Sequence, residues 1–104
     1  MRAPFLVPAL LQFPGSSARQ DAWGRLLKIT AGGGVLSTGT RLAQGEFVLV
    51  RFELGGERLV IRSRVHYAGK DDEGQCLAEM SWADMVERRR LVRVLVDVLS
   101  KSTL

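Results

Sequence analysis

The chain has 104 residues, which is room for one domain with one core, and 46% of them are hydrophobic and 25% charged, as in ordinary globular proteins. Its net charge of +4 is too mild to indicate a nucleic-acid-binding or a membrane-binding protein, and a solvated basic surface is the simpler interpretation. The single cysteine, Cys76, excludes an intrachain disulfide and fits a reducing, cytoplasmic compartment. No run approaches the roughly 20 apolar residues of a membrane-spanning helix, so stable membrane insertion is not expected.

Residues 1–18 admit two interpretations. The apolar stretch 3–11 and the small residues 16–18 imitate a short secretory signal that would be processed. Pro4 and Pro8 break that stretch, however, and a chain this short needs the apolar residues for its core. We therefore expect a first strand over Val7–Phe13.

Five further strands are predicted along the chain. Trp23–Ile29 and, after a glycine turn, Val35–Thr38 form the second and third. Phe47–Leu54 forms the fourth, because its alternate residues Val48, Val50, Phe52 and Leu54 are apolar. Gly55 and Gly56 predict a hairpin turn into a fifth strand, and Gln75–Met80 is the sixth. In the fifth strand the expected inward residues are Leu59, Ile61, Val65 and Tyr67, and the expected outward residues are Arg58, Arg62, Arg64 and His66. Six short strands with tight turns predict a closed or nearly closed antiparallel barrel.

The last part of the chain predicts a helix over residues 82–101. Ser81 followed by Asp84 has the form of an N-cap with an acid three residues on. Apolar residues then recur at helical spacing, namely Met85, Val92, Leu95, Val96 and Leu99. Valines alternate over residues 92–98, so a strand remains an alternative here, but the cap and the arginine run favour a helix. Water cannot cover this much apolar surface, so the helix must pack on the barrel or on a partner. Trp23 and Trp82 are expected to pack within the barrel and between barrel and helix.

The sequence contains no recognised arrangement of catalytic or metal-binding residues. We therefore expect neither an enzyme nor a metal site nor a cofactor. His66 is the only histidine and falls on the arginine-rich side of its strand, where a surface residue is the simpler interpretation. The adjacent carboxylates Asp71, Asp72 and Glu73 fit a solvated turn better than a cation site, because no further acidic ligand follows at loop spacing.

The segment Lys28-Ile-Thr-Ala-Gly-Gly-Gly-Val-Leu36, with Leu42–Glu46 and the strand pair after it, resembles a PilZ domain. That family carries Asp/Asn-x-Ser-x-x-Gly between its second and third strands, and Lys28, Thr30 and Gly33 stand at its three defining positions. The resemblance covers nearly the whole chain. It implies a single, mainly β domain over 1–104, a small six-stranded antiparallel barrel with strands within 6–80 and a C-terminal α-helix over 82–101.

Family members commonly bind cyclic di-GMP through Arg-x-x-x-Arg ahead of the first strand and through that turn. Here Arg2 stands at the second arginine and the first is missing, while Lys28 puts a donor-only cation where an acceptor belongs. Losing two charge-assisted groups costs about 3–6 kcal/mol, or roughly two to four decades in affinity. We therefore expect weak or no nucleotide binding unless Arg25, Arg41 or a partner chain supplies the missing cation. The candidate ligand residues are Arg2, Arg25, Lys28, Thr30 and Gly33.

The resemblance implies a non-catalytic regulatory adaptor in cyclic di-GMP-related bacterial signalling, in control of a type IV pilus, motility or exopolysaccharide. Such an adaptor acts by protein–protein contact, and a homodimer is possible. The candidate partner-binding residues are Arg88, Arg89, Leu91 and Val98.

Two alternatives remain. One is a genuine cyclic di-GMP receptor that uses a different arginine set. The other is a small basic barrel that binds nucleic acid through Arg58, Arg62, Arg64 and His66. Base stacking requires exposed aromatic rings among the cations, and Tyr67 is expected on the opposite side of that strand. A nucleic-acid partner is therefore not expected.

Overall fold

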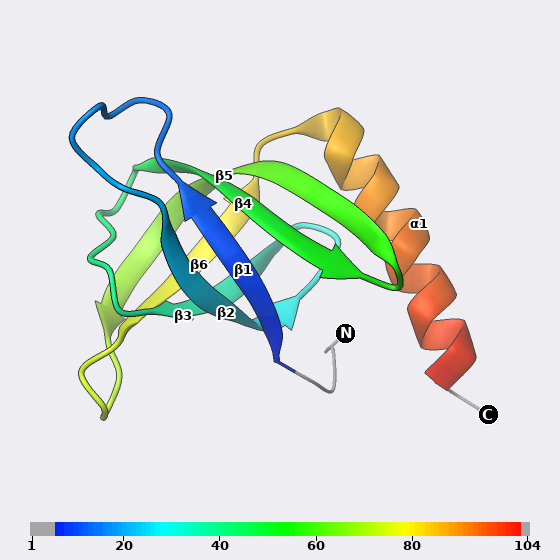
Figure 1. Ribbon diagram of the computed structural model, residues 1–104. Coiled ribbons are helices and arrows are strands. Elements are labelled where there is room, and N and C mark those ends of the chain that lie inside the picture. The colour runs from blue at the N-terminus through cyan, green and yellow to red at the C-terminus, as the bar shows by residue number, and fades with distance from the viewer. Residues whose placement is uncertain (1–5, 103–104) are drawn as a thin grey trace.

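The computed structural model describes residues 6–102, which form a closed antiparallel barrel with one helix beside it (Figure 1). The elements are β1 (Val7–Gln12), β2 (Ala22–Ile29), β3 (Gly33–Thr38), β4 (Phe47–Leu54), β5 (Glu57–Lys70), β6 (Cys76–Trp82) and α1 (Met85–Ser102). The barrel order is β1-β2-β3-β6-β5-β4, and it closes because β1 pairs with both β2 and β4. The predicted six-stranded barrel with a C-terminal helix is confirmed. No helix within residues 6–102 combines the length and apolarity that crossing a bilayer requires.

The core fills the barrel with alternate residues from every strand. β4 follows the predicted alternation, and its inward residues Val48, Val50, Phe52 and Leu54 are all buried. Leu59, Ile61 and Val65 of β5 are buried as predicted. The largest fully buried side chains of the other strands are Leu11, Leu26, Ile29 and Leu36. Each such side chain removed from water contributes about 1.5–3 kcal/mol, so the core holds the strands together.

The prediction that Tyr67 points inward is wrong. The register between β5 and β6 shifts between Val65, which pairs with Met80, and Tyr67, which pairs with Glu79. This irregularity inserts an extra residue, His66, and reverses the alternation beyond it. Tyr67 is consequently 58% exposed, on the same outer surface as His66.

The two tryptophans lie in opposite environments. Trp82 is buried and stacks on Phe52 with ring centroids 6.2 Å apart, as its predicted packing role requires. Trp23 is 68% exposed on the outer surface of β2, so its predicted packing role is wrong. The alternation that buries Leu26 turns Gly24 inward and leaves Trp23 and Arg25 outside.

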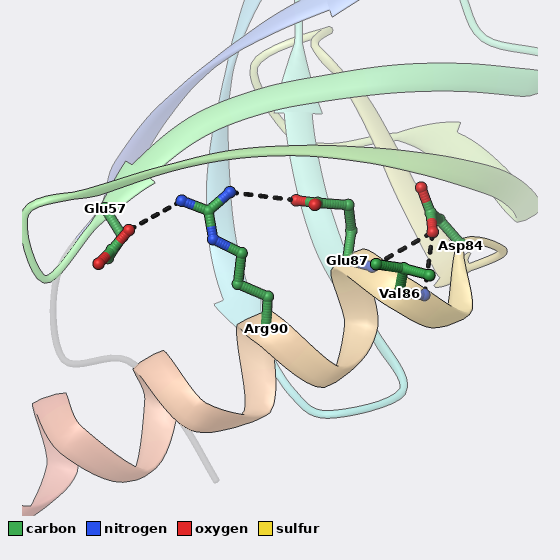
Figure 2. A network of polar contacts seen from close by, with 5 residues as sticks. All are labelled: Glu57, Asp84, Val86, Glu87 and Arg90. Atoms are coloured by element: carbon green, nitrogen blue, oxygen red, sulfur yellow. Dashed lines mark hydrogen bonds and ion pairs between the residues drawn. The ribbon is translucent and has the colours of Figure 1, made fainter.

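The helix begins at Met85, three residues later than predicted, because β6 continues through Trp82. Asp84, rather than Ser81, is the N-cap, since its Oδ1 accepts hydrogen bonds from the backbone N–H groups of Val86 at 3.1 Å and Glu87 at 3.2 Å (Figure 2). The Arg88 N–H donates to the Asp84 carbonyl at 2.9 Å and closes the first turn. A strand that leads directly into a capped helix fixes where α1 starts relative to the barrel.

The helix lies beside the tip of the β4–β5 hairpin, and two contacts hold it there (Figure 1). A Cβ on Gly55, at a φ of 59°, would lie 2.8 Å from the Val98 Cγ2 atom, so the glycine permits this close packing. Arg90 bridges to Glu57 at the start of β5 with 2.8 Å between Nη2 and Oε2 (Figure 2). Its Nη1 lies 3.7 Å from the buried Oε2 of Glu87. Both pairs are partly exposed, so packing contributes more than charge.

The helix carries two apolar stripes rather than one. The inner stripe packs on the barrel and consists of Leu91, Val94, Leu95 and Val98. The outer stripe consists of Met85, Val92 and Val96, which are 60%, 37% and 61% exposed. Of the residues that the predicted spacing selected, Met85, Val92 and Val96 belong to the outer stripe, whereas Leu95 packs on the barrel. Leu91, expected to bind a partner, is fully buried and therefore closed to one. Val98, also expected to bind a partner, packs against the core and is only partly exposed.

Replacing Leu91 with alanine is expected to lower the free energy of unfolding by about 2–5 kcal/mol, because it leaves a cavity under the helix. The matched change Val92→Ala, one residue along on the outer stripe, is expected to cost about 0.5 kcal/mol. Urea unfolding followed by circular dichroism measures both. Equal losses would contradict the assignment of the two stripes.

Candidate functional site

The turn between β2 and β3 carries two of the candidate ligand residues, Thr30 and Gly33. The Thr30 hydroxyl accepts hydrogen bonds from the N–H groups of Gly33 at 3.1 Å and Gly32 at 3.3 Å, and donates to the Gly33 carbonyl at 3.0 Å. The Thr30 N–H donates to that same carbonyl at 2.8 Å. The hydroxyl that resembles the family's serine is therefore engaged in the turn itself.

Gly33 allows the turn to approach β6 closely. It pairs with Ser81, and a Cβ at this position would lie 2.0 Å from the Met80 carbonyl oxygen. A side chain there requires the backbone to move, since no rotamer change relieves a contact with a carbonyl. Gly33 is thus required for closing β3 against β6.

The backbone carbonyls of residues 30–32 in this turn also accept hydrogen bonds from the protein. The Trp82 indole N–H donates to the Thr30 carbonyl at 2.9 Å, and the Trp82 backbone N–H donates to the Gly32 carbonyl at 3.0 Å. Arg88 of α1 donates through Nε to the Ala31 carbonyl at 2.9 Å. Arg88, expected to contact a partner, instead ties the helix to the turn. Sequence spacing gave no signal for this contact, which joins residues 57 positions apart.

Lys28 and Arg25 lie outside the barrel on β2, and both are exposed. Arg25 pairs with Pro8 of β1 and with Ser37 of β3, and Lys28 pairs with Val35 after a register shift. Within residues 6–102, neither side chain forms a hydrogen bond or ion pair. The structure therefore presents two solvated cations on β2, with Lys28 near the turn and Arg25 roughly 16 Å before it along the strand. Arg2, the third candidate cation, lies outside the described residues.

Arg41 lies at the far end of β3 from this turn, the same end at which Arg25 pairs with Ser37. It lies in the connection that follows β3, whereas the turn precedes β3, and the six residues of that strand separate its ends by roughly 16 Å. Arg41 instead lines a separate hollow of about 490 Å³ at the other end of the barrel, with Lys70 and Cys76. Of the two arginines considered as replacements, only Arg25 is on the same strand as Lys28.

A second hollow, of about 560 Å³, lies on the outer surface of β1, β2, β4 and β5. Trp23, Leu10 and Pro8 form its apolar part, and Arg51 and Arg58 lie at its border. The sequence could have indicated this hollow, because Trp23 and the exposed Arg25 are two residues apart on β2 and therefore lie on the same side of the strand. Elsewhere on the outer surface, His66 Nε2 lies 2.6 Å from the Ser81 hydroxyl. Within residues 6–102 no three His, Cys, Asp or Glu side chains gather where they could hold a metal ion.

Replacing Gly33 with alanine is expected to lower the free energy of unfolding by about 3 kcal/mol, because the added methyl meets the Met80 carbonyl. The matched control is Gly32→Ala, where a Cβ would approach only Arg88 Nη2, at 3.9 Å. That variant is expected to keep the stability within about 0.5 kcal/mol. Thermal and urea unfolding measure the difference, and equal stability of the two variants would contradict the close approach.

No protein-family model and no curated protein sequence matches the chain. Solved structures do match its fold. The PilZ domain of CeSA from a cellulose-synthesizing bacterium is 21% identical, with 98% of both chains covered and a TM-score of 0.68. The PilZ domain of YcgR from Escherichia coli, solved with c-di-GMP, is 12% identical over 97% of this chain and 88% of that one, with a TM-score of 0.74. MrkH of K. pneumonia in its apo state is 16% identical over 98% of this chain, which spans 50% of MrkH, with a TM-score of 0.69. At these identities the likeness establishes the fold, and the described barrel and helix are those of a PilZ-like domain.

Proposed function

We propose that this PilZ-like domain is a non-catalytic, cytoplasmic adaptor in cyclic di-GMP-related bacterial signalling, and that it acts on another protein of a pilus, motility or polysaccharide system. The observation that carries the proposal is the outer stripe of α1. These residues, Met85, Val92 and Val96, form an apolar row that the barrel does not cover and that remains exposed on α1. A protein partner with an apolar surface of similar length would remove this row from water.

The arginines next to the outer stripe support a protein partner of mixed character. Arg89 is exposed and lies four residues after Met85 and three before Val92, on the same side of the helix. Methionine and arginine are both enriched in protein interfaces relative to the rest of the surface, and Met85 and Arg89 provide one of each. Arg88 and Leu91 are excluded from this surface by their contacts with the barrel.

The hydrogen bonds within the turn support our proposal that nucleotide binding is weak or absent. A guanine edge presents N–H donors and so needs acceptors, but the Thr30 hydroxyl and the carbonyls of 30–32 are already bonded within the protein. Lys28 supplies only further donors at the position where the family has an acid or amide. A ligand donor would have to share each of these carbonyls with the Trp82 or Arg88 group that already donates to it.

A second candidate function is a cyclic di-GMP receptor with a different cation set. Arg25 and Lys28 are the observation in its favour, because both are exposed, uncommitted among residues 6–102, and on the strand that precedes the turn. Two cations can bind phosphate even where the base is held poorly. Nucleotide titration separates this candidate from the adaptor.

Isothermal titration of the intact chain with cyclic di-GMP is expected to give a dissociation constant of about 1 mM or weaker. Lys28→Asn restores an acceptor and is expected to tighten binding by about tenfold or more. Lys70→Asn removes the same charge at the other end of the barrel and is expected to change nothing. Micromolar binding by the wild type that disappears in Arg2→Ala or Arg25→Ala would establish the receptor and refute the adaptor.

A photo-crosslinking residue at Val96 is expected to give a discrete protein adduct in the source bacterium, because the outer stripe meets the partner. The same residue at the exposed position Glu53 on the barrel is the control and is expected to give none. Val92→Asp is expected to abolish the Val96 adduct while leaving the thermal unfolding midpoint unchanged. An adduct at both positions, or at neither, would contradict the stripe as the partner surface.

A further inference from the structure

A cluster of cationic and aromatic side chains lies outside the barrel, away from the outer stripe and the β2–β3 turn. We call it the arginine–aromatic face, and it consists of Phe47 of β4 with Arg62, Arg64, His66 and Tyr67 of β5. All five are exposed, and Phe47 and Tyr67 are among the exposed large hydrophobic side chains, at 43% and 58%. Phe47 pairs directly with Arg64, which places the aromatic ring and the guanidinium side by side.

The Phe47 ring and the two arginines form a stacked group. The Arg62 Cζ atom lies 4.4 Å from the ring centroid and the Arg64 Cζ atom 5.9 Å from it. Within residues 6–102 no carboxylate forms an ion pair with either guanidinium. A guanidinium stacked on a ring keeps its planar N–H edge free, and that edge matches the oxygens of a phosphate. The stacking therefore holds the cations in place without neutralising them.

The bulge in β5 adds a second aromatic ring to the same outer surface. Without it, the alternation would turn Tyr67 into the barrel, away from His66 and the arginines. The Tyr67 ring lies over Gly69, where a Cβ would come within 2.9 Å of its hydroxyl oxygen. Because no side chain stands at Gly69, the ring rests on the sheet and leaves its other side to solvent.

We propose that the arginine–aromatic face binds single-stranded nucleic acid without sequence preference. Phosphates of the backbone contact Arg62 and Arg64, while one base stacks on Tyr67 and another packs against the exposed part of Phe47. Proteins that bind single strands in this way combine cations that track the backbone with aromatic rings on which any base can stack. The net charge of +4 and the further cations Arg51 and Arg58 on the same two strands add attraction at longer range.

The charges on this face give it a polarity. Glu79 of β6 pairs with Tyr67, so the carboxylate lies at the tyrosine end, whereas the two arginines lie at the phenylalanine end. A phosphate is therefore held at the arginines, and the base that stacks on Tyr67 must bring its uncharged ring next to Glu79. A single strand supplies both a phosphate for each guanidinium and a flat base for each ring, and this match is why a nucleic acid fits the face.

The test is fluorescence anisotropy with a labelled oligothymidine of about 16 nucleotides, using the full chain. The expected dissociation constant is about 10⁻⁵ M at 50 mM salt, weakening steeply towards 200 mM. The double variant Arg62→Gln and Arg64→Gln is expected to bind at least tenfold more weakly and to lower the salt slope by about 1.4. The charge-matched control, Arg41→Gln with Arg93→Gln, is expected to change affinity less than twofold.

Two further variants separate stacking from charge. Tyr67→Leu is expected to weaken binding by about tenfold, whereas Tyr67→Phe keeps the ring and the affinity. Glu79→Gln removes the one carboxylate that pairs with Tyr67 and is expected to tighten binding by several-fold, which a merely structural role would not do. Circular dichroism confirms that each variant is folded.

Three results would overturn the proposal. The first is no anisotropy change at protein concentrations ten times above the expected dissociation constant. The second is an equal loss of affinity in the two charge-matched double variants, which would mean that net charge alone attracts the strand. The third is displacement by poly-aspartate as effective as displacement by unlabelled oligothymidine, which would assign the face to acidic proteins.

Discussion

The structure depends most on Trp82, because this one residue joins the barrel core to the β2–β3 turn and lies two residues before the cap of the helix. Its ring stacks on Phe52 inside the barrel, and its indole N–H holds the Thr30 carbonyl. Its backbone N–H holds the Gly32 carbonyl, and two residues later Asp84 caps α1. A buried indole must find an acceptor for its N–H, and here that acceptor is part of the turn. The conformation of the turn and the start of the helix are therefore coupled to the packing of the core.

Most of the fold could be predicted from alternation and turn residues. Phe47–Leu54 has the predicted bounds and the predicted inward residues, because a half-buried strand with a clear period of two leaves no ambiguity. Tyr67 was placed wrongly because a bulge changes the register without any residue in the sequence that demands it. In α1 the two apolar stripes have similar spacing, and periodicity alone does not say which of them the barrel covers.

The candidate site was predicted in part. Thr30 and Gly33 do meet in one turn, as the motif implies, and Lys28 lies on the strand that leads into it. The side-chain bonds from Trp82 to Thr30 and from Arg88 to Ala31 could not be predicted, because they join residues 52 and 57 positions apart. These bonds decide which acceptors remain for a ligand. The motif residues could thus be identified from the sequence. Whether their polar atoms are free to bind a ligand depends on tertiary contacts.

The bulge at His66 makes this residue separable from the rest of its strand. Val65 pairs with Met80 and Tyr67 pairs with Glu79, the next residue along β6, so deleting His66 would make the two residues consecutive and leave each on its present side of the sheet. A deletion at a regularly paired position would instead turn the side chains that follow it to the opposite side. The barrel can therefore lose or regain this one position while its interior stays the same.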